Sequence, residues 1–257
     1  MSTLLTGTLA TLVFCAPGYP GGAGDAQPLI DQFINAAVAI SGWPAGSLAA
    51  VYDPTEEGGL AKLGSADAVL AFVPYPFFVE HAAQLHLRPL VQADVANVGP
   101  QQRWTLVAKS GHVTGPASMS GYTILSVAGY APNFVRHIAL EGWALPSDVK
   151  LESTGQILSA LRRVAAGERV AVLLDQTQAA ALPSLPFASE LKVVTQSPEL
   201  PVAIIAVVDS RVTAGRARAL QAGLLKIGRV SGSADSLAPL RLHGFVQTKL
   251  PPQAAAR

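Results

Sequence analysis

The chain has 257 residues, enough for one large domain or two smaller lobes with cores of their own. Half of the residues are hydrophobic and only 14% are charged, a composition typical of a compact α/β protein whose strands are buried on both faces. The 18 basic and 17 acidic residues form no basic block, which argues against a nucleic-acid partner, and the single cysteine excludes an intramolecular disulfide.

The first informative stretch is LVFCAPGYPGG, residues 12–22. It could end a signal peptide, carry a lipid, bind a phosphate, or form the first strand and loop of a domain. Residues 1–12 contain no Lys or Arg, Phe14 stands where a lipid-attachment site has a small residue, and no Lys-Ser/Thr pair follows the glycines. We therefore expect a strand at 9–14, then a loop and a helix from Asp25, with any export signal absent from the sequence as given.

Strands and helices alternate through the first part of the chain, which is typical of a parallel sheet with right-handed crossovers. The first helix has apolar residues at helical spacing and ends at Gly42. Thr55 is a suitable N-cap for the second helix because two acidic residues follow it. The elements expected are helices at 26–41, 55–64 and 75–87 and strands at 47–53, 66–74 and 88–95.

The same alternation restarts at residue 103. The segment 237–246, near the C-terminus, is expected to be a short helix or turn. The longest apolar runs are strand-sized or broken by proline, so no transmembrane helix is predicted. The other elements expected are a strand within 103–113, a strand, loop and helix over 121–140, helices at 155–166, 175–182 and 213–230, strands at 170–174 and 191–197, and an extended segment at 198–210.

Two successive groups of strands and helices predict two lobes with a cleft between them. Ligands of open α/β sheets bind outside the carboxyl ends of the strands. The candidate cleft lining therefore consists of the loops that follow the strands, which are PGYPG at 17–21, PYPFF at 74–78, AGYAPNF at 128–134 and DQTQ at 175–178.

Four segments carry a resemblance to a known family. They are ADAVLAFVPYPFF at 66–78, MSGYTILSVAGYAPNFVRHIAL at 119–140, ILSALRRVAAGERVAVLLDQ at 157–176 and VVTQSPELPVAIIAVV at 193–208. Through their order and pattern the chain resembles the type II periplasmic solute-binding proteins. The likeness is to the phosphonate-binding-protein-like (PhnD-like) branch, the substrate-binding proteins of ABC transporters.

The resemblance implies an α/β fold of the two-lobed, Venus-flytrap type, each lobe being a mostly parallel sheet flanked by helices. Lobe one would comprise 1–108 and 202–257, lobe two would be 109–201, and hinge strands would lie near 107–110 and 197–201. The resemblance also implies a periplasmic monomer, without catalysis or cofactor. Such a protein captures a small-molecule ligand and passes it to membrane transporter components.

The chain departs from the family where an oxyanion would bind. Oxyanion binders of this branch typically have Ser or Thr hydroxyls and free backbone N–H groups at the start of the lobe-two helix. Here the position reads GYAPN at 129–133, and Pro132 removes one N–H donor. Arg136 and His137 follow only a helical turn later, and aromatic residues are frequent in the cleft loops. The sequence therefore favours a neutral, flat or lipid-like ligand, such as a sterol, over a simple oxyanion.

The predicted ligand-binding residues come from these loops, and several have a structural alternative. Phe77 could lie in the core, and Asn133 could cap the helix that follows it. Asp175 could be either a helix N-cap or a hydrogen-bond acceptor in the cleft. The predicted set is Tyr19, Pro20, Tyr75, Phe77, Tyr130, Asn133, Phe134, Asp175 and Gln176.

The leading hypothesis is a solute receptor for envelope transport, with no chemistry of its own. One alternative is a phosphonate- or phosphate-type oxyanion receptor. Another is an enzyme on the same scaffold, which would need a general base in the cleft. Asp175 is the acidic residue that we expect to lie in the cleft. A third is a sensory module that uses closure as a signal. No metal site is expected, since the histidines, His81, His86, His112, His137 and His243, have no paired spacing.

Overall fold

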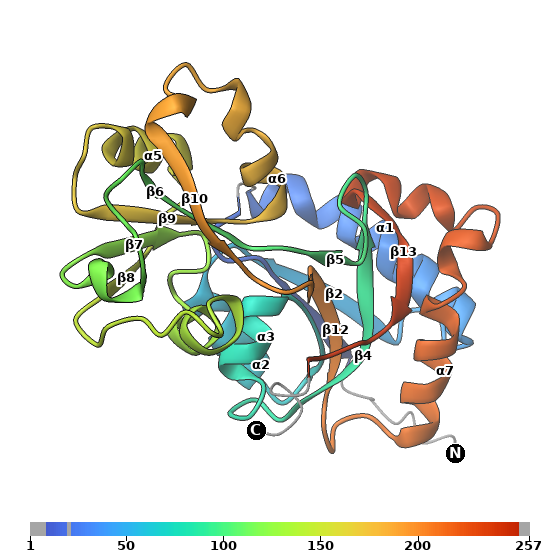
Figure 1. Cartoon of the computed structure of the whole chain (residues 1–257). Helices are drawn as coiled ribbons and strands as arrows, with labels where there is room; N and C mark the ends of the chain where they lie inside the picture. The colour runs from blue at the N-terminus through green and yellow to red at the C-terminus, as the bar shows by residue number, and fades with distance from the viewer. Residues whose placement is uncertain (1–8, 20–21, 252–257) are drawn as a thin grey trace, which may run out of the picture.

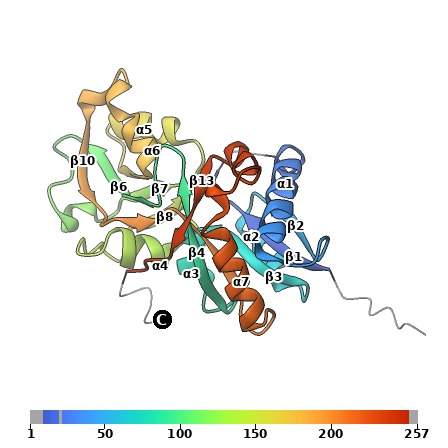
Figure 2. The same cartoon turned by 90° about the vertical axis from the view of Figure 1, so that its right-hand side faces the viewer.

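The computed structural model describes residues 9–19 and 22–251 and has two lobes, seen side by side in Figure 1 and Figure 2. Each lobe is an α/β unit built on one sheet with helices against it. The strand order is β13-β4-β12-β3-β1-β2 in the first lobe and β10-β6-β9-β7-β8 in the second. The two-lobed α/β fold predicted from the sequence is therefore confirmed.

The first lobe contains both ends of the described chain. Helices α1 (Ala23–Ser41) and α7 (Ala214–Leu224) pack against each other on one side of its sheet, and α2 (Glu56–Gly64) and α3 (Tyr75–His81) lie on the other. Its strands are β1 (Ala10–Cys15), β2 (Leu48–Asp53), β3 (Ala68–Pro74), β4 (Leu87–Val95), β12 (Ala203–Val208) and β13 (Leu242–Gln247).

Strand β3 shows why these residues form a sheet covered on both faces. All of its residues, from Ala68 to Pro74, are buried. Side chains alternate along a strand, so Leu70 and Phe72 pack in the core beneath α1, and Ala71 and Val73 pack beneath α2 and α3. A continuous apolar run therefore gives a central strand with two cores.

Two helix ends follow the sequence signals. Gly42 ends α1 in the left-handed conformation, with φ +68°. The side-chain oxygen of Thr55 accepts a hydrogen bond from the backbone N–H of Gly58 at 3.1 Å and caps the start of α2. Both end points agree with the prediction.

The second lobe is built around strands β7, β8 and β9, which run parallel. Helix α5 (Ile157–Ala165) packs on one face. The short helix α4 (Pro132–Phe134) continues into a π-helical turn (Val135–Ala139) that belongs to the core of the other face. The remaining elements are β6 (Thr105–Lys109), β7 (Thr123–Ser126), β8 (Lys150–Ser153), β9 (Val170–Leu174), β10 (Leu191–Gln196) and α6 (Gln176–Ala180).

Both sheets are mixed, but most strands of each sheet run in one direction, as the sequence analysis expected. Strands β12 and β13 pair antiparallel with their neighbours in the first lobe, as β6 does in the second. Strands β6 and β12 enter their lobes from the connections between the sheets, and β13 starts at the same edge. These three strands therefore run antiparallel to the neighbouring strands that end at that edge.

Two short connections join the lobes. Strand β5 (Gln101–Gln102) pairs antiparallel with β11 (Leu200–Pro201). Beside them, the backbone N–H of Trp104 donates to the hydroxyl of Ser197 and the N–H of Ser197 donates to the carbonyl of Trp104, both at 2.8 Å. The boundary predicted at 107–110 falls inside β6, a strand of the second sheet, so the first connection lies earlier. Hinge motion at β5 and β11 stays a prediction.

The C-terminal segment differs from the sequence interpretation. Residues expected to form a helix or turn include strand β13, which pairs with β4 and buries Leu242 and Phe245. Its partner lies about 150 residues earlier, and local sequence carries no sign of such a pairing. Within the described part of the chain, no helix combines the length and apolarity needed to cross a bilayer.

The lobes touch directly at Gly18, in the loop after β1. Gly18 has φ +81°, and a Cβ atom on it would lie 2.6 Å from the carbonyl oxygen of Val127 in the second lobe. Contact this close admits only glycine, because real Cβ atoms do not approach another atom below 3.0 Å.

We expect Gly18→Ala to lower the melting temperature more than Gly42→Ala. Both substitutions force alanine into a left-handed conformation, which costs about 1–2 kcal/mol. Only Gly18 adds a clash with the second lobe, since a Cβ at Gly42 meets nothing within 4 Å. Thermal unfolding followed by circular dichroism measures the difference, and equal losses would show that the contact at Val127 is not maintained in solution.

Candidate functional site

A cavity of about 210 Å³ lies between the lobes. It is formed at the carboxyl ends of β1, β3 and β4 and at the start of β12, and residues of α6 and β5 complete its lining. This is the position where open α/β sheets bind ligands. The lining residues are Phe14, Cys15, Ala16, Tyr19, Phe72, Val73, Pro74, Ala93, Val95, Val98, Gln102, Asp175, Thr177, Val202, Ala203, Leu240 and Leu242.

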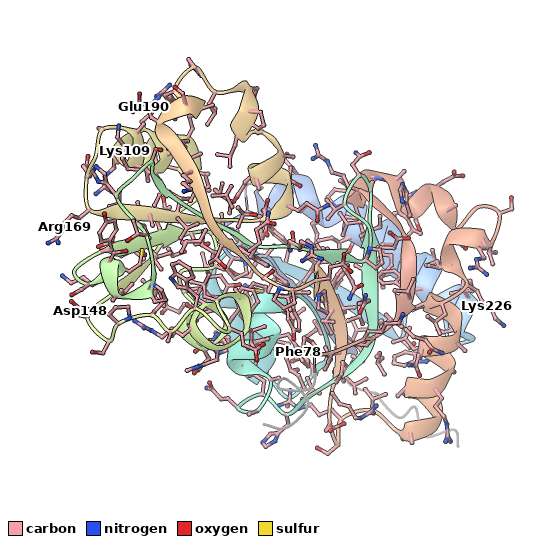
Figure 3. The ribbon with its side chains drawn as sticks, viewed as in Figure 1. Phe78, Lys109, Asp148, Arg169, Glu190 and Lys226 are labelled. Atoms are coloured by element: carbon pink, nitrogen blue, oxygen red, sulfur yellow. The ribbon has the colours of Figure 1, made fainter. Side chains whose placement is uncertain are left out.

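Most of the lining is apolar. Phe14 and Phe72 form part of the wall, with ring centroids 4.5 Å apart. The polar groups of the lining come from Tyr19, Gln102, Asp175 and Thr177, and no Lys, Arg or His stands among the described lining residues. Lys109 and Arg169 lie at the outer edge of the second lobe, far from the cavity (Figure 3). The net side-chain charge at the cavity is therefore negative.

Asp175 follows β9 and has two roles. Its Oδ1 accepts a hydrogen bond from the N–H of Gln178 at 2.8 Å, and the side-chain oxygen of Gln178 accepts one from the N–H of Asp175 at 3.1 Å. This reciprocal pair caps α6. The other oxygen, Oδ2, lies 3.5 Å from the hydroxyl of Tyr19 in the first lobe. Asp175 is thus both a helix N-cap and an acceptor in the cleft, the two alternatives left open by the sequence.

The environment shifts the protonation of this pair. Burial raises the pKa of the Asp175 carboxyl above its usual value, and hydrogen bonds from Gln178, Thr177 and Tyr19 partly offset the effect. Burial and the neighbouring Asp175 charge raise the pKa of Tyr19 well above its usual range. Tyr19 therefore stays a neutral hydroxyl donor at neutral pH.

Gln102 brings the connection between the lobes into the site. It lies on β5 and is buried, and its Oε1 is 3.5 Å from the backbone N–H of Gln176. The cavity is consequently lined by the first lobe, the second lobe and the connection. The sequence analysis missed Gln102, although Gln101 and Gln102 are a polar pair directly before residue 103, where the alternation of strands and helices was expected to restart.

Three of the predicted site residues meet at the cavity. Tyr19 and Asp175 line it, and Gln176 lies beside it through its contact with Gln102. Pro20 is outside the described residues. Ligand binding by these residues stays a prediction.

The predicted aromatic residues of the other loops are buried and do not line the cavity: Phe77 packs within the first lobe, and Tyr75 and Phe134 meet between the lobes. Tyr75, Phe77 and Phe134 have no exposed surface. The ring of Phe134 meets Tyr75 and Trp104 edge to face, with centroid distances of 6.0 and 5.2 Å. Their area is buried against each other, which leaves no ring face for a ligand here.

Tyr130 and Asn133 are not among the described lining residues of the cavity, although Tyr130 lies near Tyr19 and Cys15, which are. Tyr130 is half-buried and packs on the core of α4, and burial raises the pKa of its hydroxyl well above the usual range, with Tyr19 contributing. Asn133 is exposed and bonds to Glu80 of α3: its backbone N–H and its Nδ2 each donate to the carboxylate at 2.9 Å.

Cys15 lies at the floor of the cavity and donates from its thiol to the carbonyl of Thr55 at 3.3 Å. Burial, with the charges of Asp53 and Glu56, raises the pKa of the Cys15 thiol to about 12, against a smaller opposing effect of Lys62. No group of three or more metal-ligating side chains occurs among residues 9–19 and 22–251.

The comparisons with known proteins concern the fold. Neither a family model nor a curated protein sequence matches the chain. XAC2383 from Xanthomonas citri bound to chloride ion aligns over 96% of this chain and 94% of its own, with 14% identity and a TM-score of 0.69. The binding protein component of an ABC phosphonate transporter from Pseudomonas aeruginosa aligns over 93% and 82%, with 14% identity and a TM-score of 0.60.

A third similar structure is PhnD1 from Prochlorococcus marinus in complex with methylphosphonate. It aligns over 95% of this chain and 94% of its own, with 12% identity and a TM-score of 0.57. The chain therefore has the two-lobed fold of the type II periplasmic solute-binding proteins, including PhnD-like ones. This confirms the resemblance at the level of the fold.

Cys15 should be inert in the native protein. We expect no alkylation by iodoacetamide at pH 8, because the thiol is buried and remains protonated, and complete alkylation after unfolding in urea. Mass spectrometry of the intact chain measures both states. Rapid labelling of the native protein would contradict the closed floor of the cavity.

Substitutions of Asp175 should separate two effects of this residue on stability: the capping of α6 and the burial of a negative charge. Asp175→Ala should cost about 1 kcal/mol through the lost cap, a fall of about 2–4 °C in Tm. Asp175→Asn keeps a good cap and removes a buried charge, so it should raise the Tm at pH 7.

The gain from Asp175→Asn should depend on pH. Because the pKa of Asp175 is higher in the folded state, its ionisation destabilises the fold fully above that pKa. The penalty disappears as the pH falls below the unfolded pKa of about 3.9. The Tm difference between Asp175→Asn and the wild type should shrink toward pH 4, and a pH-independent difference would refute the burial effect.

Proposed function

We propose that this protein is a periplasmic solute-binding protein of an ABC-type transport system. It holds a small, largely apolar ligand with a hydrogen-bond-donating group in the cavity between its lobes and delivers the ligand to membrane components. The observation that carries this proposal is the apolar cavity, shared by both lobes, whose polar end is the Tyr19–Asp175 pair.

The position of the cavity supports capture by closure. A ligand there touches Phe14 and Phe72 of the first lobe and Asp175 and Thr177 of the second. Only contacts made to both lobes at once favour the closed form. A ligand in this cavity makes such contacts.

The volume of the cavity supports a small ligand. Pockets for drug-sized molecules measure about 300–1,000 Å³, and this cavity measures about 210 Å³. It favours a ligand smaller than a whole sterol, or one end of a longer apolar molecule.

The charge at the cavity supports a donor group on the ligand. Tyr19 keeps its proton, and Oδ2 of Asp175 has only a long contact at 3.5 Å, which leaves capacity to accept a further hydrogen bond. An ammonium or hydroxyl group suits this end. A phosphonate would place its charge against the Asp175 carboxylate, with no cationic side chain in the described lining.

The lining gives little support to the enzyme hypothesis. Asp175, Tyr19 and Cys15 are the ionisable groups of the described lining. One oxygen of Asp175 caps α6, the Cys15 thiol donates to a backbone carbonyl, and the pKa of Tyr19 is raised well above its usual range, so none of the three is activated as a nucleophile at neutral pH. The oxyanion hypothesis has one specific observation in its favour, the similar structures described as phosphonate-binding.

Thermal-shift measurements with four probes test the proposal: cyclohexylamine, cyclohexanol, methylphosphonate and inorganic phosphate. A ligand at about one hundred times its Kd adds about 2.7 kcal/mol, a rise of about 5–10 °C for a chain of this size. We expect a rise with cyclohexylamine and a smaller one with cyclohexanol. A rise with methylphosphonate or phosphate alone would replace this proposal by the oxyanion receptor.

Variants assign the binding to the cavity. Asp175→Asn should reduce the effect of cyclohexylamine more than that of cyclohexanol, since it removes the charge and keeps the shape of the cavity. Asp235→Asn, a change of the same type at an exposed residue of the first lobe, is the matched control and should leave both effects intact. Equal effects of the amine on wild type and Asp175→Asn would show that it binds elsewhere.

A further inference from the structure

The lobes are joined by a second polar contact, away from the cavity. Glu80 lies on α3 of the first lobe and Asn133 at the start of α4 in the second. Oε2 of Glu80 accepts from the backbone N–H of Asn133 and Oε1 accepts from its side-chain Nδ2, both at 2.9 Å. One carboxylate thus uses both of its oxygens across the lobe boundary.

This contact lies at the rim of an apolar interface. Phe134, the next residue after Asn133, is fully buried between Tyr75 of the first lobe and Trp104 next to the connection. Phe78 lies two residues before Glu80 on α3 and is within the first lobe in Figure 3. Its ring stacks on that of Tyr75, with the ring centroids 6.4 Å apart. The polar contact and the aromatic packing therefore form and separate together.

In a two-lobed protein, any interaction that is more favourable in the closed state than in the open state increases the population of the closed state. A ligand normally supplies this difference. Here Glu80, a residue of the protein itself, supplies such an interaction. Its two hydrogen bonds to Asn133 can form only while α3 and α4 are adjacent. The backbone and side-chain donors of Asn133 are both satisfied by a side chain of the protein itself.

We propose that Glu80 is an intramolecular latch that holds the lobes together in the absence of ligand. This inference depends on the two-lobed fold and not on the identity of the ligand. The latch makes closure partly independent of ligand. Removing Glu80 shifts the ligand-free protein toward an open state.

Distance measurements between spin labels test the latch. Labels at Gln32→Cys on α1 and Ser184→Cys in the second lobe are both at exposed positions, and the buried Cys15 stays in place. Without ligand, the otherwise wild-type chain should give one short, narrow distance distribution. Glu80→Ala should add a second population at longer distance. Glu80→Gln should lie between them, since its amide oxygen still accepts from the N–H of Asn133.

Two controls separate the latch from a general loss of stability. Glu57→Ala removes an exposed carboxylate from the same lobe and should leave the distances unchanged. Asn133→Ala removes the side-chain bond and keeps the backbone bond, so it should produce a smaller open population than Glu80→Ala. If Glu80→Ala does not fold, the distances measured in Asn133→Ala test the latch instead. The latch is refuted if the wild type without ligand is already open, or if both variants keep the short distance alone.

Discussion

The arrangement of this protein depends on the burial of Phe134 between Tyr75 and Trp104. These rings join the core beneath α2 and α3 to the core of the second lobe, so that one continuous group of buried residues spans both. A continuous core favours this arrangement of the two sheets, because moving them apart would expose these buried rings to water. The cavity at Tyr19 and Asp175 exists because this packing fills one side of the interface and leaves the other open.

Carboxylates occupy the second-lobe helix starts that face the first lobe. Asp175 caps α6 from within the lobe, and Glu80 reaches the start of α4 from the opposite lobe. Backbone N–H groups at such positions attract anions. Here the chain fills both with its own acids, which supports the proposed preference for a ligand that donates a hydrogen bond.

The sequence predicted those features that depend on local patterns. Apolar periodicity located most strands and helices, and Thr55 and Gly42 marked helix ends, because capping depends on nearby residues. Strand β13, the antiparallel course of β12 and the connection at β5 were missed, because they depend on partners distant in the chain. Tyr19 and Asp175 could be predicted to face each other, since each follows a strand whose carboxyl end points to the cleft between the lobes.

The aromatic residues mark the limit of such reasoning. Phe77 and Phe134 also follow strands, yet their rings are buried in the core, and no sequence pattern states which side of a loop a ring will take. Gln102, Leu240 and Leu242 line the cavity from segments whose path the sequence did not reveal.

The paired bonds between Trp104 and Ser197 have a mechanical consequence. Together with the pairing of β5 and β11, they tie the outgoing and returning connections into one ribbon. Neither segment can twist alone without breaking a bond to the other. In the hinge motion that we predict, this ribbon would favour rotation of the lobes about a single axis, and loss of the bonds in one segment would also free the other.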